Sequence, residues 1–273
     1  MDAATRRIRA LVLAGDRRER DALAVAGGVA HKALIEVGGV PMLVRVVRTL
    51  SAVPRIGEIL VSTGSADLLE SHPELAALRA SGVLQHHASA GSPAASVEDA
   101  VASAPADSPL LVTTADHPLL APAMVEHFCD AAERSGAAVA AAVVPESVIR
   151  ARFPDVKRTF IPLRGEAITG ANLFWFGSAE GAAAARFWRR TEEVRKKPWR
   201  LASLFGPGVF LRFAARRLDL DGVTRELSLR VGLPVAAVRL PFAECGLDVD
   251  RPDDLRLAER VLAGASAASP SGA

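Results

Sequence analysis

The sequence lacks the features that would place the chain in a membrane or on nucleic acid. No apolar run reaches the ~18 to 20 residues needed to cross a bilayer, and residues 1–9 lack the apolar stretch of a signal peptide. Basic and acidic residues nearly cancel, at 33 and 31, so neither a nucleic-acid-binding tract nor an acidic tail is indicated. We therefore expect a cytoplasmic protein that binds neither nucleic acid nor membrane.

Cysteine and the common nucleotide-binding signatures are scarce as well. The two cysteines, Cys129 and Cys245, stand far apart and form no metal-binding spacing, so two reduced thiols are expected. No Gly-Lys-Ser/Thr follows Gly15, and Gly15 lacks further glycines at the spacing of a dinucleotide fingerprint. These absences exclude a Walker-type phosphate loop and the usual dinucleotide-binding motif.

What the sequence does contain is an alternation of apolar strands and amphipathic helices over 273 residues. A strand at 10–13, a helix at 41–52 and a strand at 56–62 form the repeating unit of a parallel sheet. No repeat or low-complexity linker divides the chain, so we predict one α/β domain. Further strands are expected at 83–84, 110–115, 137–144 and 235–240, and an aromatic strand that ends at 176 is expected to follow a turn at 170–172. Further helices are expected at 66–81, 122–135, 179–196 and 221–232, together with an alanine-rich helix that ends at about 104.

The first strand is followed by a loop rich in cations. Gly15 lets the backbone turn sharply and approach a ligand where a side chain would collide. The loop carries Arg17, Arg18 and Arg20, and Lys32 follows further on. Because open α/β sheets bind their ligands at the carboxyl ends of their strands, we predict that this loop binds a triphosphate.

Asp116 follows the strongest apolar strand of the chain. Residues 110–115 read Leu-Leu-Val-Thr-Thr-Ala and lead into Asp116 and His117. An aspartate in this place either caps the next helix or holds a cation, and Pro122, which starts that helix, lies too far on for Asp116 to be its cap. Asp116 is therefore the strongest single candidate for a functional residue, whereas His117 is expected to be structural.

Three segments of the chain carry motifs in a defined order: Leu13-Ala14-Gly15-Asp16 with Arg20, Lys32 and Gly39-Val40-Pro41-Met42; Asp116-His117-Pro118-Leu119; and Asp248-Val249-Asp250-Arg251-Pro252-Asp253-Asp254-Leu255. Together they resemble the signature of the MobA-like nucleotidyltransferases, which have a glycosyltransferase-A type fold. Asp16 departs from the pattern, because it replaces a second glycine, and so does His31, which stands where many relatives have proline. The resemblance implies a Rossmann-like sheet flanked by helices, spanning residues 1–262.

The resemblance also implies a metal site. Asp116 and Asp250 match the positions that hold Mg²⁺ in the family, and Asp248 lies two residues earlier on the same face of an extended chain and is expected to assist. Two carboxylates plus phosphate oxygens suit this ion. Because two nearby carboxylates without their metal repel each other, changing either to Asn is expected to leave stability unchanged or slightly higher.

The remaining nucleotide contacts follow from the same resemblance. Arg20 and Lys32 are expected to act in catalysis by stabilising the departing pyrophosphate. The turn of Leu13, Ala14 and Gly15, with Arg17 and Arg18, is expected to bind the nucleotide. Gly91 and Ser96 are candidates for contact with the base or ribose, although an ordinary capped helix start explains them equally well.

Residues 146–215 interrupt the simple strand–helix alternation and are expected to form an inserted subregion that binds the acceptor. Gly170 and Asn172 are predicted to lie in a turn before an aromatic strand, where a purely structural role is also open. Lys196 and Lys197 are further acceptor candidates, although basic residues also suit a helix C-terminus. After 262, the Ala-, Ser-, Pro- and Gly-rich tail at 263–273 is expected to be disordered.

The predicted activity is Mg²⁺-dependent transfer of a nucleoside monophosphate from an NTP to a phosphorylated small-molecule acceptor, with release of pyrophosphate. A sugar or polyol phosphate, a cobinamide phosphate and a pterin cofactor are all open as acceptors. Two alternatives remain: a nucleotide-binding regulator that has lost turnover, and a glycosyltransferase that uses a nucleotide sugar. The Arg and Lys placed for a leaving pyrophosphate favour the nucleotidyl reaction.

Overall fold

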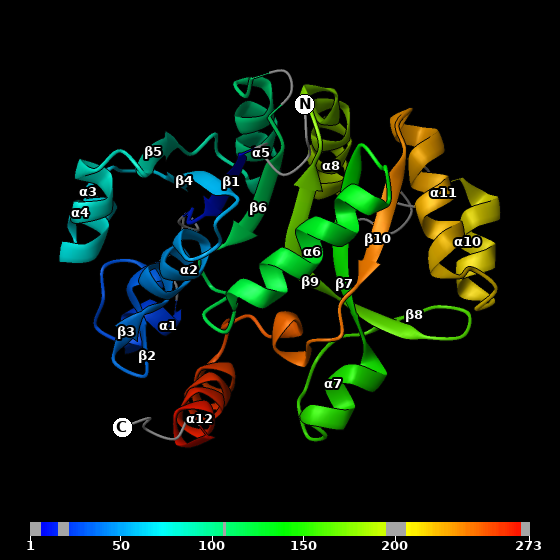
Figure 1. The fold of residues 1–273 in the computed structure, drawn as a ribbon. Helices are drawn as coiled ribbons and strands as arrows, with labels where there is room; N and C mark the ends of the chain where they lie inside the picture. The colour runs from blue at the N-terminus through cyan, green and yellow to red at the C-terminus, as the bar shows by residue number, and fades with distance from the viewer. Residues whose placement is uncertain (1–6, 16–21, 106–107, 195–205, 269–273) are drawn as a thin grey trace.

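A computed structural model describes residues 7–15, 22–105, 108–194 and 206–268. Within these ranges an eight-stranded sheet forms the centre of the molecule (Figure 1), with strand order β10-β7-β9-β6-β1-β4-β5 and with β8 paired to β9 outside that row. The strands are β1 (Ile8–Leu13), β4 (Ile56–Thr63), β5 (Leu84–Ala88), β6 (Leu110–Thr114), β7 (Val139–Pro145), β8 (Ile161–Pro162), β9 (Ala167–Phe176) and β10 (Val235–Arg239); a separate hairpin joins β2 (Glu36–Val37) to β3 (Val40–Pro41).

The sheet is mostly parallel, as predicted. β4, β1 and β6 pair in parallel, as do β4 with β5 and β10 with β7. β9 runs antiparallel to both β6 and β7 and lies between them. The prediction of an insertion at 146–215 is therefore corrected in part, because this region supplies a central strand. The physical reason is that β9 buries side chains on both of its faces, which requires cover from two helical layers.

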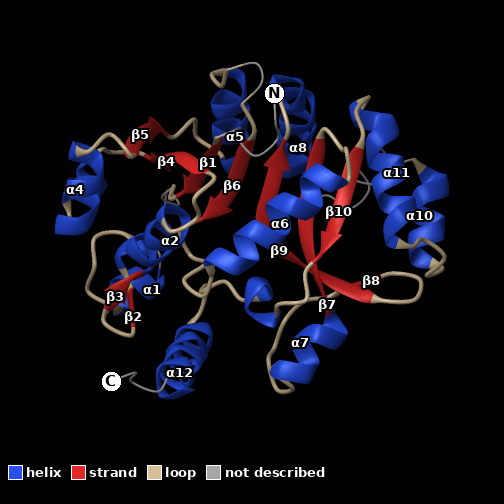
Figure 2. Ribbon diagram, in the orientation of Figure 1, coloured by secondary structure: helices blue, strands red, loops and turns tan. Residues whose placement is uncertain are grey.

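Helices cover both faces of the sheet (Figure 2). The side chains of α2 and α6 pack on one face, and those of α5 and α8 pack on the other. The α-helices are α1 (Ala22–Ala26), α2 (Met42–Ser51), α3 (Asp67–Glu70), α4 (Pro73–Ala80), α5 (Pro93–Ala102), α6 (Pro122–Arg134), α7 (Glu146–Arg152), α8 (Ala182–Val194), α10 (Pro207–Ala214), α11 (Leu220–Val231) and α12 (Pro252–Ala268), with short 3-10 helices η2 (Lys32–Leu34), η3 (Ala179–Gly181) and η4 (Ala243–Gly246).

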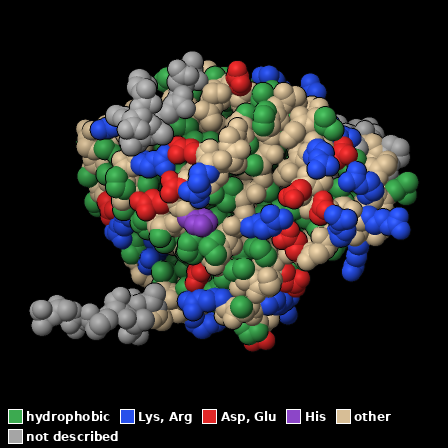
Figure 3. Space-filling view, turned by 45° about the vertical axis from the view of Figure 1, so that its right-hand side comes forward, with side chains coloured by type: hydrophobic (Ala, Val, Ile, Leu, Met, Phe, Trp, Pro, Cys, Tyr) green, Lys and Arg blue, Asp and Glu red, His purple; other side chains and the backbone are tan. Residues whose placement is uncertain are grey.

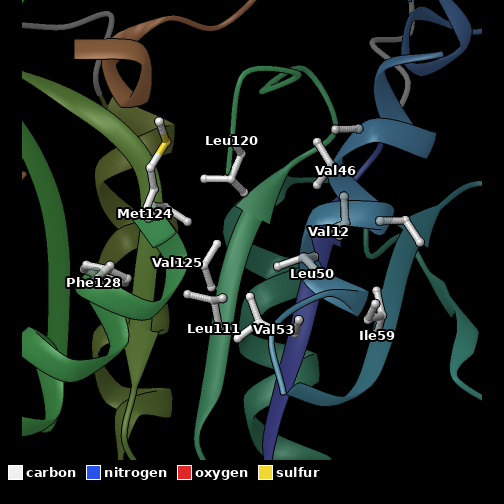
Figure 4. Packing of buried hydrophobic residues seen from close by; sticks show 14 of the residues in the cluster. Val12, Val46, Leu50, Val53, Ile59, Leu111, Leu120, Met124, Val125 and Phe128 are labelled. Carbon is white, nitrogen blue, oxygen red and sulfur yellow. The ribbon is translucent and has the colours of Figure 1, made fainter. Parts of the chain in front are cut away.

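Alternate residues of the central strands face the two helical layers. Val12 of β1 belongs to the cluster under α2 and α6, whereas its neighbour Leu11 belongs to the cluster under α5 and α8. Burying a side chain of this size stabilises the fold by about 1.5–3 kcal/mol. The first cluster (Figure 4) brings together Val12, Val46, Leu50, Val53, Ile59, Leu111, Leu120, Met124, Val125 and Phe128.

The structure corrects the predicted bounds of several elements, and two of these corrections have a clear physical reason. The helix predicted at 66–81 is two helices, α3 and α4, because Pro73 cannot continue the hydrogen bonding of a helix and instead starts a new one. The last helix continues to Ala268, so the tail predicted from 263 starts too early. Its alanine-rich sequence favours helix over coil. Residues 269–273 lie outside the described ranges.

The surface carries many ion pairs, such as Arg239 with Glu166 at 2.7 Å and Arg152 with Glu244 at 3.0 Å. Basic and acidic side chains lie next to one another on the face drawn in Figure 3. Exposed pairs contribute only about 0–1 kcal/mol each, so the core supplies most of the stability. In the part of the chain that the structure describes, no helix has the length and apolar character needed to cross a membrane.

Both cysteines are free thiols in the core. Burial raises the pKa of the Cys129 thiol to about 12, against an opposing effect of Arg55. Burial likewise raises the pKa of Cys245 to about 12. Neither thiol is a nucleophile at neutral pH, because the thiolate is the reactive form.

Candidate active site

A cavity of about 540 Å³ opens at the carboxyl ends of the parallel strands. Leu13 ends β1, Ser62 lies at the end of β4, and Thr114 ends β6, and all three line the cavity. This is the edge at which open α/β sheets bind ligands. Of the predicted site residues, those that line it are Leu13, Gly15, Lys32, Gly91, Ser96, Asp116, Asn172, Asp248 and Asp250.

A hydrogen bond between backbone atoms joins Asp116 to the segment around Val249. The chain that follows β10 runs along the lower end of the sheet before it enters α12 (Figure 1), and the amide of Val249 donates a hydrogen bond of 2.9 Å to the carbonyl of Asp116. Leu247 and Val249 are buried, whereas the alternate residues Asp248 and Asp250 are less buried and line the cavity. The period of an extended chain therefore turns both carboxylates towards Asp116.

Lys32 connects the two predicted metal ligands. Its Nζ donates to Asp116 Oδ2 at 2.8 Å and to Asp250 Oδ1 at 2.6 Å. Because one nitrogen is bonded to both oxygens, these oxygens lie no further apart than the sum of the two distances. Asp116 and Asp250 thus meet at one point although they lie far apart in the sequence.

Lys32 stands at the start of η2, and His31 caps this short helix. His31 Nδ1 accepts a hydrogen bond of 3.0 Å from the amide of Ala33. The His31 ring is buried, with 8% of its surface exposed. The departure from proline at this position therefore has a structural explanation: the ring fixes the backbone from which Lys32 projects.

The electrostatic environment of Lys32 keeps it charged. Burial of the ammonium acts to lower the pKa of Lys32, but the charges and hydrogen bonds of Asp116 and Asp250 outweigh this effect and the pKa is raised. The two carboxylates are therefore compensated by a cation. The expectation that replacing either Asp by Asn leaves stability unchanged or higher assumed an uncompensated repulsion between the two carboxylates. Lys32 compensates both charges, so a loss of stability is now the predicted outcome.

The donor set fits Mg²⁺ when phosphate completes it. The described residues hold no group of three or more His, Cys, Asp or Glu side chains able to bind a metal by themselves. Mg²⁺ is usually bound by one or two carboxylates together with substrate phosphates and water, which is what Asp116 and Asp250 provide. Asp116 Oδ1 is buried and accepts no hydrogen bond from the residues that the structure describes, so one oxygen of this carboxylate is left for a ligand.

Asp248 has different partners from the other two carboxylates. Its side chain forms an ion pair with Arg158 and accepts a hydrogen bond of 3.4 Å from Asn172 Nδ2. Arg158 was missed by sequence reasoning, because a basic dipeptide, Lys157-Arg158, in a polar stretch is usually a solvated surface. The pair makes Asp248 a group that positions this wall of the cavity.

His117 is completely surrounded by protein, with 1% of its surface exposed. Burial lowers the pKa of His117, against opposing effects of Asp116 and Asp248. The ring is therefore neutral at pH 7, where a catalytic acid would have to carry a proton. Its position agrees with the structural role expected for it.

The segment before α5 and the first turn of α5 form the wall that contains Gly91 and Ser96. Ser92 is the helix cap, since its Oγ accepts a hydrogen bond of 3.2 Å from the amide of Ala95. Ser96 lies within the first turn, and its Oγ accepts one of 3.0 Å from the amide of Ala90. Gly91 has a φ of 85°, which favours glycine. The capping role therefore belongs to Ser92, and Gly91 and Ser96 shape the loop at the cavity.

Helix α8 supplies residues that sequence reasoning did not single out. Trp188, Thr191 and Glu192 line the cavity beside Phe174 of β9. The rings of Trp188 and Phe174 lie 4.9 Å apart between centroids, and Glu192 Oε2 accepts a hydrogen bond of 3.4 Å from the amide of Ala94. From the sequence alone, an aromatic residue at helical spacing such as Trp188 is interpreted as part of the hydrophobic core. That it lines a cavity depends on how α8 packs against α5, which the sequence does not give.

Three predicted positions are corrected. Gly170 and Asn172 lie inside β9, where the pairing with β7 shifts register, and not in a turn before the strand. Gly170 is exposed and does not line the cavity. Ala14 is buried, with 4% exposed, and does not line it either. The predicted cations Arg17, Arg18, Arg20, Lys196 and Lys197 lie outside the described residues.

The mostly parallel sheet, with helices on both faces and a cavity at its carboxyl edge, defines a Rossmann-like α/β protein. The chain belongs to the family of the MobA-like NTP transferase domain, whose model matches residues 10–198. A structure described as a hypothetical transferase from Thermus thermophilus is 30% identical, with a TM-score of 0.76, and the match covers 91% of this chain and 99% of that one.

Two further solved structures share the fold at lower identity. A 4-diphosphocytidyl-2C-methyl-D-erythritol synthase from Anaerococcus prevotii is 14% identical, with a TM-score of 0.57, over 95% of this chain and 99% of its own. A CMP:2-keto-3-deoxy-manno-octonic acid synthetase complexed with CTP is 15% identical, with a TM-score of 0.57, over 95% and 99%. At these identities the likeness shows the fold alone. No curated protein matches the sequence.

Proposed function

We propose that this protein transfers a nucleoside monophosphate from an NTP to a phosphorylated small-molecule acceptor, in a Mg²⁺-dependent reaction that releases pyrophosphate. One observation carries the proposal: Asp116, Asp250 and Lys32 meet at one point on the wall of a cavity of about 540 Å³. The family membership supports a nucleotide triphosphate as one substrate. The paired carboxylates supply what a metal-bound triphosphate needs.

In the proposed reaction, a phosphate oxygen of the acceptor attacks the α-phosphorus of the NTP. The bond from that phosphorus to the oxygen bridging to the β-phosphate breaks, and pyrophosphate leaves with the electron pair. A phosphate nucleophile is already ionised at pH 7, so the step needs alignment and charge neutralisation more than an acid or a base. When bound, Mg²⁺ would offset the negative charge that develops on the phosphates.

Different residues of the chain would bind the metal, stabilise the leaving group and form the walls of the cavity. Asp116 and Asp250 would hold the metal, and Lys32, which lines the same cavity, would stabilise the charge that gathers on pyrophosphate. Asp248, fixed by Arg158, and Asn172 would form the wall near the acceptor. Gly91 and Ser96 would line the nucleotide side.

The test is a pyrophosphate-release assay with each of the four common triphosphates, Mg²⁺ and a panel of phosphorylated acceptors. At least one pair should give turnover that disappears with Asp116→Asn. Asp130→Asn is the matched control, because Asp130 also pairs with a cation, Arg55, but lies on α6 and does not line the cavity.

Two other results would replace the proposal. Nucleotide binding without turnover across a broad acceptor panel would favour a regulator. Transfer of a sugar from a nucleotide sugar, with release of a nucleoside diphosphate, would favour a glycosyltransferase.

A further inference from the structure

We propose that Lys32 occupies the cation position between Asp116 and Asp250 in the free protein, and that it leaves this position when a divalent cation and a triphosphate bind together. Lys32 is thus a built-in counter-ion that couples the two ligands. The role of the triphosphate rests on the proposed function, whereas the competition between Lys32 and the metal stands on the geometry of the free protein.

The first argument is that the ammonium and a metal compete for the same pair of carboxylates. Lys32 Nζ lies 2.8 Å from Asp116 Oδ2 and 2.6 Å from Asp250 Oδ1. A Mg²⁺ ion bound at ~2.1 Å to either oxygen would lie within about 5 Å of that nitrogen. Two cations at this separation repel each other strongly in a partly buried site, and only 15% of the Lys32 side chain is exposed.

The second argument is that Lys32 has a fixed base and a movable end. The His31 cap and the buried side chain of Ala33 anchor the backbone of η2. A lysine side chain carries its charge on a flexible four-carbon stem. Because Lys32 lines the cavity that also contains Gly15 and Gly91, its ammonium has open space to move into without a change in the backbone.

The consequence is that the metal and the triphosphate assist each other. Without a triphosphate, a metal ion must displace Lys32 and leave its charge uncompensated. With a triphosphate present, the displaced ammonium gains an anionic partner. Coupling of this kind is reciprocal, so the nucleotide strengthens metal binding by the same factor by which the metal strengthens nucleotide binding.

A residue next to the cavity, Arg158, offers a matched control for simple charge effects. Arg158 pairs with Asp248 in the same way that Lys32 pairs with the other two carboxylates. Removing Arg158 also removes one positive charge from the neighbourhood, but it frees neither Asp116 nor Asp250. A gain in metal affinity confined to variants of Lys32 therefore identifies competition at the carboxylate pair.

The experiment is a titration of the full chain with Mn²⁺, followed by the electron paramagnetic resonance signal of the free ion, in the absence of nucleotide and acceptor. Lys32→Met should bind Mn²⁺ about tenfold or more tightly than the wild type. Lys32→Arg, which keeps the charge, and Arg158→Met should stay close to wild type. Circular dichroism and thermal unfolding would identify any variant that fails to fold.

A second arm tests the release of the ammonium with a metal-free probe. Inorganic tripolyphosphate, titrated calorimetrically in the presence of a chelator, should bind Asp116→Asn/Asp250→Asn more tightly than the wild type. The gain should disappear when Lys32→Met is added to that pair. This arm gives a result even if a Lys32 single variant does not fold.

The proposal is overturned if Lys32→Met binds Mn²⁺ no more tightly than the wild type, or if Arg158→Met gives the same gain. It is also overturned if the tripolyphosphate gain persists without Lys32. None of these measurements involves turnover. A failure here would therefore leave the transfer reaction standing, and a failure of the pyrophosphate assay would leave the competition result standing.

Discussion

Replacing Asp116 and Asp250 by Asn, singly and together, tests whether the two carboxylates act as one unit. Both are bonded to the same ammonium, at 2.8 and 2.6 Å from Nζ, so they are close enough for one ion to bridge. Removing one group that stabilises charge in a transition state typically lowers kcat by about 10²–10³. We expect a loss of this order from each single variant.

The double variant distinguishes a shared site from two separate ones. If both carboxylates hold one ion, the double variant should be about as slow as the slower single variant, because residues that act as a unit are not additive. If they act independently, the two factors should multiply, to roughly 10⁴–10⁶. The assay is pyrophosphate release at saturating NTP and acceptor, with Asp130→Asn as the unaffected control.

Stability gives an independent measure of the same pair. Asp116 and Lys32 are 24% and 15% exposed, between the surface pairs worth ~0–1 kcal/mol and the buried pairs that cost ~3–5 kcal/mol to break. Asp116→Asn should therefore lower the free energy of unfolding by about 1–3 kcal/mol. Asp250 is 40% exposed, so its change should cost less than ~1 kcal/mol. A gain in stability from Asp116→Asn, or rate losses that multiply, would refute the shared site.

Three further predictions concern residues away from this pair. Cys129 and Cys245, whose thiol pKa is raised by burial, should not react with a thiol reagent at pH 8 until the protein is unfolded, when two thiols should be counted. Burial lowers the pKa of His87, against an opposing effect of Asp99. Below pH ~6.5 the unfolded chain therefore binds more protons than the folded chain, and the free energy of unfolding should fall as the pH falls. Urea titration should show a smaller fall for His87→Gln. Trp188→Ala should weaken nucleotide binding by about 1–3 kcal/mol if a base stacks on the ring, measured calorimetrically, and an unchanged affinity would place the base elsewhere.

The elements of the sheet were predictable where the signal is local. β1, β6 and α2 follow from apolar runs and helical periodicity within a short window, and the structure confirms them close to their predicted bounds. The place of β9 was not predictable, because strand order depends on pairing between residues far apart in the chain. An apolar strand after an irregular region is compatible with an insertion or with the centre of the sheet, and only the packing decides.

The active site also combines residues that the local sequence identifies with contacts that only the three-dimensional packing determines. Asp116 at the end of an apolar strand, and Lys32 and Asp250 in motifs that resemble a known family, are found from residue type and order, and the structure brings all three together. That Lys32 would lie between the two carboxylates was not predictable, since sequence order gives no distance between side chains. Arg158 and Trp188 were missed because each has an ordinary surface or core explanation in the sequence alone.

The backbone conformation of Asn172 could not be predicted from the sequence. Variants of Asn172 test how this residue contributes to the cavity wall near Asp248. It has a φ of 49° inside β9, where the register with β7 shifts.

Asn172→Gly keeps this backbone accessible and removes only the hydrogen bond to Asp248, at a cost of about 0.5–1.5 kcal/mol. Asn172→Ala loses the same bond and also places an alanine in the left-handed region, which costs roughly 1–2 kcal/mol more. Urea denaturation of both variants should therefore find Asn172→Ala less stable than Asn172→Gly by about 1 kcal/mol or more. Equal stabilities would mean that the backbone at Asn172 is not left-handed. If Asn172 also contacts the acceptor, both variants should raise the KM for the acceptor equally, because both lack the amide whatever their stability.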